Sequence, residues 1–403
     1  MNITEDELRA RLQIWRAVGI GPASLNRLLN HFGSAVAALD GSDAEIIKAG
    51  LKPAILQNLR SVPIEAALAD LEWLHRAAHR HILVPEDPRY PKLLRALKAA
   101  PPVLFVAGQP EVLNEPQLAM VGSRTPTHYG KENAQAFAQY LAKQGITVTS
   151  GLALGIDAIS HQGALDAGGA TIAVIATGLD IIYPAKNRSL AERIVEQGAI
   201  VSEFPIGVKP QAQNFPRRNR VISGLSLGCL VVEAALQSGS LVTAQHALEQ
   251  GREVFAIPGS IHSPLAHGCH RLIRQGAKLV ETAADILEEL TPQLHSYLGT
   301  APLGWQATQT TLVSTQPSQT IKSGKPLSFL KNLTTQENTE EWLETQLDPE
   351  EQQILATIGL EPVPIDQIVL QTGLTPDVVS SMLLMLELQG YIAACGGGRY
   401  QRL

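Results

Sequence analysis

The sequence predicts an α/β protein whose core is a doubly wound, mostly parallel sheet, with a helical domain before it and a winged-helix domain after it. Between residue 101 and about residue 291, short uncharged apolar runs alternate with longer amphipathic stretches. Such alternation is typical of parallel strands covered by helices on both faces. The expected strands are residues 118–121, 146–149, 171–176, 199–202, 227–232, 253–257 and 278–280.

The flanking regions have different patterns. Residues 1–100 have apolar positions at three- and four-residue spacing, which predicts helices, and Val18-Gly19-Ile20-Gly21-Pro22 indicates a SAM-like or helix-hairpin-helix turn. Residues 292–347 are rich in Thr, Gln, Ser and Pro and are expected to form a flexible linker. Residues 348–403 contain three short helical patterns and two glycine-flanked strand patterns, which predict the winged helix.

Composition restricts the class of protein. The 403 residues are 45% hydrophobic and 17% charged, which is typical of two or three folded domains. Three scattered cysteines argue against a disulfide scaffold or a zinc ribbon, and they fit a reducing cytoplasm. No apolar stretch approaches the ~20 residues needed to cross a bilayer, and the acidic start is unlike a signal peptide. We therefore expect a cytoplasmic protein without membrane insertion.

Four loops that follow expected strands carry small polar residues. They contain Gly122-Ser123-Arg124, Ser150-Gly151, Gly178-Leu179-Asp180 with Lys186 downstream, and Ser238-Gly239-Ser240. In a parallel sheet these loops meet at the carboxyl ends of the strands, where ligands bind. Their exposed backbone N–H groups at helix starts favour anions. Gly122 would let the backbone turn sharply and approach the ligand closely. The sequence thus predicts a phosphate-bearing ligand.

A basic segment lies near these loops. Between Pro205 and Val232 there is no Asp or Glu, while Lys209, Arg217, Arg218 and Arg220 all fall there. We expect a loop that Phe215-Pro216 stiffens, and Arg218 and Arg220 would point to the same side if this loop is extended. Together with Arg124 and Lys186 these cations would follow a polyphosphate backbone with little sequence preference. With 4% aromatic residues, extensive base stacking is not expected.

Cofactor and metal sites are not expected. The Gly-Lys pair Gly324-Lys325 lies in the expected linker without a preceding strand and is followed by Pro326, and the first loop lacks the spacing of a dinucleotide site. Three histidines and a cysteine, at positions 262, 267, 269 and 270, lie close together, but their spacing fits no tetrahedral zinc pattern. We therefore predict no cofactor and no metal.

Three residues at strand ends keep an enzymatic alternative open. Asp157, His161 and Glu233 stand where an enzyme places acid–base groups, so a nucleotide or nucleoside-monophosphate hydrolase remains possible. The favoured interpretation is that Asp157 and Glu233 orient loops or cap helices. No catalytic residue is therefore predicted.

The ordered motifs resemble the bacterial DNA-processing protein A (DprA/Smf) family. The resemblance covers about residues 100–290 and includes Gly122-Ser123-Arg124, Ser150-Gly151, Gly155-Ile156-Asp157, Gly178-Leu179-Asp180, Phe215-Pro216, Arg218-Asn219-Arg220, Ser238-Gly239-Ser240 and Ile257-Pro258-Gly259-Ser260. It implies a non-enzymatic Rossmann-like protein of natural transformation and competence that binds single-stranded DNA. It also implies protection of incoming strands, loading of the RecA recombinase and a homodimer.

The expected DNA contacts combine the loops, the basic segment and the family positions. They are Gly122, Ser123, Arg124, Ser150, Gly151, Lys186, Arg217, Arg218, Asn219, Arg220, Ser238, Gly239 and Ser240. The winged helix is not expected to add to them. Residues 332–398 contain no Lys or Arg but eleven Asp and Glu, whereas DNA binding needs cations. The acidic residues of this region contribute to the net charge of −6, and we predict that the winged helix contacts protein and not DNA.

Overall fold

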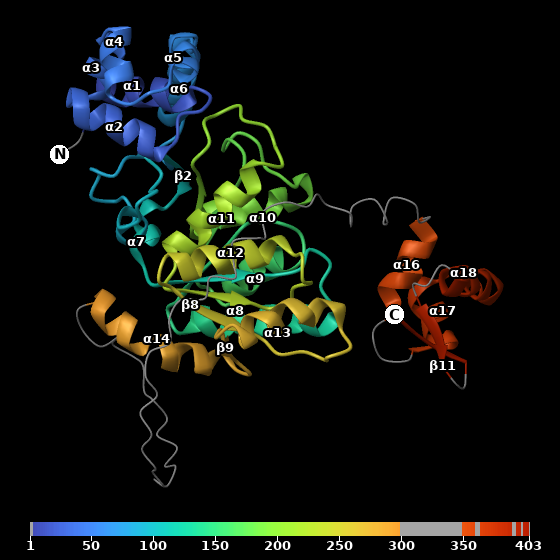
Figure 1. Cartoon of the computed structure of the whole chain (residues 1–403). Helices are drawn as coiled ribbons and strands as arrows, with labels where there is room; N and C mark the ends of the chain where they lie inside the picture. The colour runs from blue at the N-terminus through green and yellow to red at the C-terminus, as the bar shows by residue number, and fades with distance from the viewer. Residues whose placement is uncertain (1–2, 299–348, 359–362, 389–391, 396–397, 403) are drawn as a thin grey trace. The chain divides into compact units, whose positions relative to one another are not determined.

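The computed structural model describes residues 3–298, 349–358, 363–388, 392–395 and 398–402. They belong to two compact units, Met1–Gly304 and Trp305–Leu403 (Figure 1). Residues 299–347 of the expected linker lie outside the described residues, but its first part does not. Residues 292–298 complete a helix, α14 (Ala283–Leu298), so the expected start of the linker at residue 292 is wrong. The composition of residues 292–347 suggested that the linker begins at Pro292, yet the helix continues through this residue.

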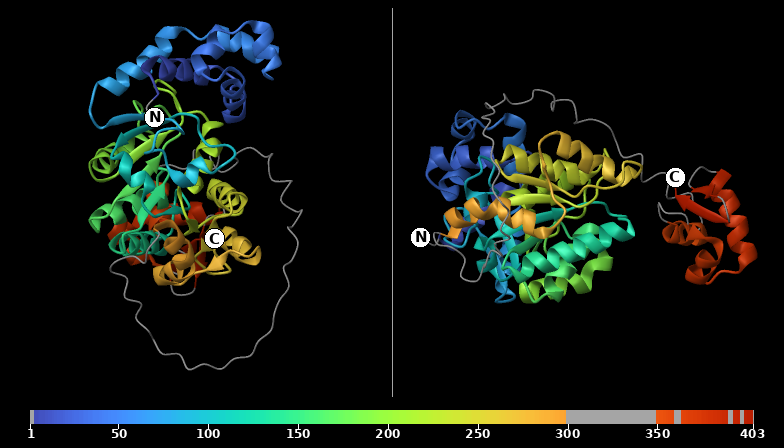
Figure 2. Two further views of the ribbon diagram at one scale, coloured as in Figure 1. Left: turned by 90° about the vertical axis from the view of Figure 1, so that its left-hand side faces the viewer. Right: turned by 90° about the horizontal axis from the view of Figure 1, so that it is seen from below.

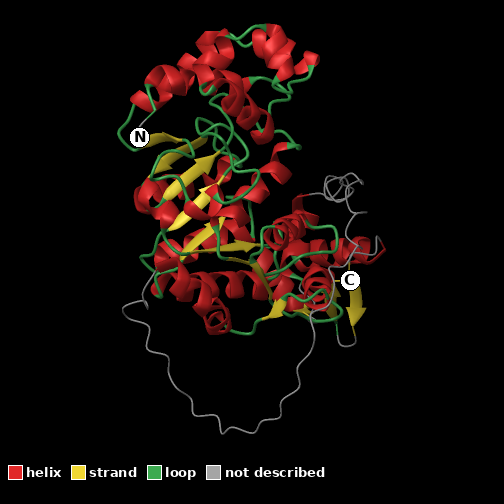
Figure 3. Cartoon of the chain, turned by 60° about the vertical axis from the view of Figure 1, so that its left-hand side comes forward, coloured by secondary structure: helices red, strands yellow, loops and turns green. Residues whose placement is uncertain are grey.

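A nine-stranded sheet forms the centre of the first unit, in the order β1-β2-β6-β5-β4-β3-β7-β8-β9 (Figure 3). All neighbours from β6 to β9 are parallel, while β1 and β2 pair antiparallel at one edge. The strands are β1 (Arg80–Leu83), β2 (Leu104–Gly108), β3 (Gln117–Val121), β4 (Thr147–Ser150), β5 (Thr171–Val174), β6 (Ala199–Ser202), β7 (Gly228–Val231), β8 (Glu253–Ala256) and β9 (Lys278–Leu279). The predicted fold class and all seven expected strands are confirmed.

Helices cover both faces of the sheet (Figure 2). They are α7 (Lys92–Arg95), α8 (His128–Lys143), α9 (Ile156–Asp166), α10 (Arg188–Gln197), α11 (Asn214–Leu225), α12 (Gly239–Glu249) and α13 (His267–Arg274). Alternate residues of a strand point to opposite faces. In β5, Ile172 and Val174 belong to the core cluster that includes side chains of α11, whereas Ala173 belongs to the cluster with residues of α9 and α10. This cover on both faces explains why the central strands, β3 to β7, are uncharged.

Six helices precede the sheet. They are α1 (Glu5–Arg16), α2 (Pro22–Phe32), α3 (Ala35–Asp40), α4 (Asp43–Lys48), α5 (Pro53–Arg60) and α6 (Ile64–His75). Gly19, at φ +92°, makes the turn between α1 and α2. The expected domain boundary near residue 100 does not coincide with the sheet, because β1 begins at Arg80 and pairs with β2. Core side chains of the helices, such as Trp15, pack in one cluster with Phe105 of β2.

The second unit has the expected helices and wing. They are α16 (Pro349–Thr357), α17 (Ile365–Thr372) and α18 (Pro376–Leu388), with a three-stranded sheet in the order β10 (Val363–Pro364), β12 (Arg399–Arg402) and β11 (Ile392–Cys395). Its core includes Ile354, Ile368, Val379 and Leu383. Among the described residues of both units, no helix combines the length and the apolar character that a membrane span requires.

Candidate functional site

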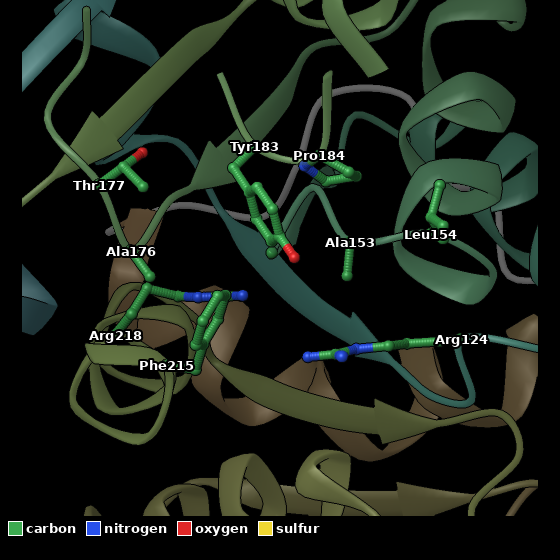
Figure 4. Close-up of a pocket in the computed structure, with 10 residues that line it drawn as sticks. Arg124, Ala153, Leu154, Ala176, Thr177, Tyr183, Pro184, Phe215 and Arg218 are labelled. Atoms are coloured by element: carbon green, nitrogen blue, oxygen red, sulfur yellow. The ribbon is translucent and has the colours of Figure 1, made fainter. Parts of the chain in front are cut away.

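Three of the four loops predicted to bind an anion meet at a pocket in the first unit, whereas the loop with Ser238-Gly239-Ser240 does not line it (Figure 4). It lies at the carboxyl ends of β3, β4 and β5 and beside the first turns of α11. The lining residues are Arg124, Gly151, Ala153, Leu154, Ala176, Thr177, Tyr183, Pro184, Phe215 and Arg218. Of the expected DNA contacts, Arg124, Gly151 and Arg218 line this pocket.

Arg218 is the central feature of the pocket. Its side chain is only 6% exposed and lies against Gly151, where a Cβ atom would come within 1.5 Å of Arg218 Nη1. Within the described residues its guanidinium makes no hydrogen bond and no ion pair, and Nε is buried without a partner. Burial lowers its pKa to about 10, although the charge of Asp157 acts in the opposite direction. A buried cation with free donors is suited to hold an anion.

Two further cations near the pocket are free. Arg124 is exposed, with its guanidinium 5.9 Å from the ring centre of Phe215, and it points toward the same space as Arg218 (Figure 4). Lys186 is exposed on a short 3-10 turn, η2 (Ala185–Asn187), in the loop that follows β5. In the described part of the chain neither side chain has a hydrogen-bond or ion-pair partner. Both can therefore neutralise phosphates.

The basic segment is a helix and not the loop that we expected. Pro216 suggested a stiff loop, but proline is tolerated in the first turn of a helix because no intrahelical N–H is needed there. Helical geometry sends the arginines to different places: Arg220 forms an ion pair with the buried Glu203 and donates to the carbonyl oxygen of Ala99. Arg217 is half-exposed and lies 4.0 Å from Glu203. The condition for Arg218 and Arg220 to share one side, an extended backbone, is therefore not met.

Asp157 holds the loop after β4. Its Oδ2 accepts hydrogen bonds from the backbone N–H groups of Gly151 and Ala153, at 3.1 and 3.4 Å. Between them Leu152 adopts φ +59°, which is uncommon for a residue with a side chain. Burial raises the pKa of Asp157, and the charge of Arg218 opposes that rise. Asp157 thus orients a loop, as the sequence indicated.

Glu233 plays the same kind of role for the loop after β3. Its carboxylate accepts from the N–H of Thr127, at 3.0 Å, and from the Thr127 hydroxyl. Gly122 lies beneath this loop, and a Cβ there would come within 2.6 Å of Ile156 Cγ1 and 3.0 Å of the Glu233 carbonyl oxygen. Gly122 is therefore needed for packing, and its close approach to a ligand stays a prediction.

The predicted serines also hold loops in place. Ser150 is fully buried and donates to the carbonyl oxygen of Met120 at 2.6 Å, and the Ser123 hydroxyl accepts from the N–H of Thr125. Ser238 caps α12 by accepting from the N–H of Ser240. The side chain of Asn219 donates to the carbonyl oxygen of Gly239 at 3.3 Å, which brings this loop beside α11. Gly239 itself is exposed.

Sequence reasoning missed an aromatic pair. Tyr183 is 49% exposed, and the centre of its ring lies 6.1 Å from the centre of the Phe215 ring. Both rings line the pocket together with Arg124 and Arg218 (Figure 4). The low aromatic content argued against base stacking, and the two residues of the pair are distant in sequence, so the sequence did not show that they lie together. A signal was present, since each aromatic residue directly precedes a proline and lies within three residues of a cation, Lys186 after Tyr183 and Arg217 after Phe215.

The histidine and cysteine group forms no metal site among the described residues, where no cluster of three or more potential ligands exists. Cys269 is buried, with its thiol facing the carbonyl oxygens of Val231 and Val232. His270 Nε2 lies 2.9 Å from the carbonyl oxygen of Gly259. Elsewhere, burial lowers the pKa of His161 to about 3, so this imidazole is neutral and contacts the Thr171 hydroxyl.

Comparison with known proteins agrees with this architecture. The family model described as DNA recombination-mediator protein A matches residues 81–291. The chain belongs to this family. Models of the DprA-like N-terminal HHH domain and the DprA winged helix domain match residues 5–42 and 339–398, so both flanking domains are those of the family. The resemblance found in the motifs is confirmed.

Relatives of this family extend over most of the chain. Protein Smf of Escherichia coli is 43% identical over 90% of this chain and 87% of its own length. Protein Smf of Synechocystis is 38% identical over 96% of this chain and 97% of its own. The crystal structure of DprA from Streptococcus pneumoniae, 34% identical, superposes with a TM-score of 0.63 and covers 72% of this chain and 99% of that one.

Proposed function

We propose that the first unit binds single-stranded DNA at the pocket between Arg124 and Arg218. The observation that carries this proposal is the buried guanidinium of Arg218, which has no hydrogen-bond or ion-pair partner within the described residues. A backbone phosphate would supply the missing acceptor oxygens. Arg124 and Lys186 would hold neighbouring phosphates, and the half-exposed Arg217 lies on the same helix as Arg218.

The aromatic pair favours a single strand over a duplex. Tyr183 and Phe215 offer ring faces next to the two arginines, so a base can stack there while its phosphate reaches Arg218. Bases in a duplex are already stacked and paired, and their faces are not available. Contacts to phosphates and base faces carry little sequence information, which suits a protein that accepts any strand.

Family membership supports a wider role. We propose that the bound strand is protected and passed to the RecA recombinase during natural transformation, in the cytoplasm, by a homodimer of this chain. The family description, DNA recombination-mediator protein A, favours such a role. The winged helix would contact protein, because residues 332–398 contain no Lys or Arg. RecA filament formation on strands coated with a single-strand-binding protein, with and without this chain, tests the transfer, and light scattering tests the dimer.

A hydrolase would need Asp157 or Glu233 as an acid or base. Both carboxylates already accept hydrogen bonds from the loops they hold, so the geometry favours binding over catalysis. Gel-shift titration with single- and double-stranded oligonucleotides, paired with chromatography for free base released from nucleotides, separates the two functions. We expect shifted single strands and no free base; the reverse pattern would replace binding by hydrolysis.

Replacing Arg124 with Ala should weaken binding of single strands of every sequence. Each lost phosphate contact flattens the slope of log K against log salt concentration by about 0.7. Fluorescence anisotropy with a labelled oligonucleotide at several salt concentrations measures this slope. Arg274, an exposed arginine in the last turn of α13, provides the control variant Arg274→Ala. A slope equal to that of the wild type would remove Arg124 from the site.

Replacing Tyr183 with Ala should weaken binding without changing the salt slope. Loss of one stacked base costs about 1–3 kcal/mol, whereas the number of phosphate contacts stays the same. Tyr183→Phe keeps the ring face and should bind as the wild type does. The same titration measures all three proteins. Equal losses in both variants would indicate that the hydroxyl, and not the ring, contacts DNA.

A further inference from the structure

The segment Glu203–Gly207, directly after β6, lies between the N-terminal helices and the helix that carries Arg218. Its neighbours on one side are α1 and α6, and on the other side α11. Partly buried Ile206 packs against the core cluster of the N-terminal helices. One short segment of backbone thus contacts both the helical layer and the proposed DNA site.

On the N-terminal side, two buried side chains fix the backbone of this segment. The indole Nε1 of Trp15 donates to the carbonyl oxygen of Glu203 at 2.7 Å. Asp70, whose side chain is completely buried, accepts from the N–H of Ile206 at 3.0 Å. Arg16 binds both carboxylate oxygens of Asp70 at 2.7 Å and also donates to the carbonyl oxygen of Ile206. Both polar groups of the Ile206 backbone are therefore held by the helical layer.

On the other side, the same segment holds α11. The carboxylate of Glu203, 1% exposed, forms the ion pair with Arg220 and lies 4.0 Å from Arg217. The guanidinium of Arg217 also lies 5.2 Å from the ring centre of Phe204. Phe215 and Arg218, which line the pocket, belong to this helix. A shift of residues 203–207 must therefore shift the helix that presents the proposed phosphate site.

We propose that the N-terminal helices set the position of α11 through residues 203–207, and that Asp70 and Trp15 are positioning residues for the DNA site. This inference rests on the proposed function of the pocket. Neither residue lines the pocket, so each acts through the backbone it holds. Coupling between sites is reciprocal: if these contacts favour DNA binding, bound DNA must stabilise these contacts by the same factor.

The test uses the full chain and two conservative variants. Asp70→Asn keeps the shape of the side chain but removes the charge that Arg16 binds, and Trp15→Phe keeps an aromatic ring but removes the N–H donor. We expect both to weaken binding of a 30-mer oligothymidylate by about 2- to 30-fold, as coupled residues do. The control, Asp43→Asn, removes an exposed ion pair with Arg60 on the same helical layer and should bind as the wild type does.

A second readout distinguishes positioning from simple loss of structure. In the 15N-labelled wild type, the indole resonance of Trp15, assigned by its absence in Trp15→Phe, should exchange with solvent more slowly when the oligonucleotide is bound. Both results are required. The inference would be overturned if the folded variants bind the oligonucleotide as tightly as the wild type, or if the exchange rate of the Trp15 indole N–H is the same with and without the oligonucleotide. If Asp70→Asn does not fold, Trp15→Phe decides. If the wild type itself does not bind the oligonucleotide, the proposed function fails instead.

Discussion

Replacing Arg218 with Met should abolish strong binding of single-stranded DNA and at the same time raise the melting temperature of the first unit. Removing one partner of a buried, charge-assisted contact costs about 2–5 kcal/mol of binding free energy. In the free protein, burial lowers the pKa of Arg218 to about 10, so the folded state disfavours its charge. Each unit of such a shift corresponds to about 1.4 kcal/mol. Methionine fills similar space without charge, and we expect a gain of about 1–3 kcal/mol in the free energy of unfolding.

Thermal denaturation followed by circular dichroism, with and without a 30-mer, measures both effects. The oligonucleotide should raise the melting temperature of the wild type, because it binds only the folded state, and should leave that of Arg218→Met unchanged. Arg274→Met, on the exposed last turn of α13, controls for loss of one positive charge. A variant less stable than the wild type would mean that Arg218 stabilises the free protein, and the phosphate site would then lack its main support.

The parallel part of the sheet was predictable because strands that are buried on both faces consist of uncharged, mostly apolar residues. Residues 171–174 of β5, Thr-Ile-Ala-Val, are all buried and uncharged. The two antiparallel strands, β1 and β2, were not predicted. β1 contains Arg80 and His81, and it becomes a strand only through its pairing with β2. β2 follows Pro101-Pro102, which suggested a domain break, and its partner β6 is distant in sequence. Long-range pairing of this kind is not visible in local patterns.

The position of the candidate site was predictable, but the contacts of its residues were not. Glycines and small polar residues at strand ends pointed to the edge of the sheet where the pocket lies, yet the sequence does not show which neighbour fills the space beside a glycine. At Gly122 that neighbour is Ile156, whereas at Gly151 it is Arg218. The sequence also did not show where the side chains of Arg218 and Arg220 would point. Positions two residues apart on a helix point about 200° apart, so Arg218 faces the pocket while Arg220 pairs with Glu203.

Replacing Gly151 with Ala should therefore impair DNA binding with little loss of stability. The new Cβ would come within 1.5 Å of Arg218 Nη1 and 2.7 Å of Asp157 Oδ2, which are both ends of side chains. Arg218 can move away, but its guanidinium then leaves the position from which it reaches a phosphate. We expect binding to weaken by about 2–4 kcal/mol, close to the effect of losing the arginine contact.

Gly122→Ala is the matched comparison, because its Cβ would meet the backbone of Glu233 and the branched end of Ile156. These neighbours are tightly packed, so Gly122→Ala should lower the free energy of unfolding by about 1–3 kcal/mol. Urea denaturation and anisotropy titration of both variants separate the two effects. If Gly151→Ala binds single strands as tightly as the wild type, the phosphate does not depend on the buried position of Arg218. The proposed site would then have to move to the exposed Arg124 and Lys186.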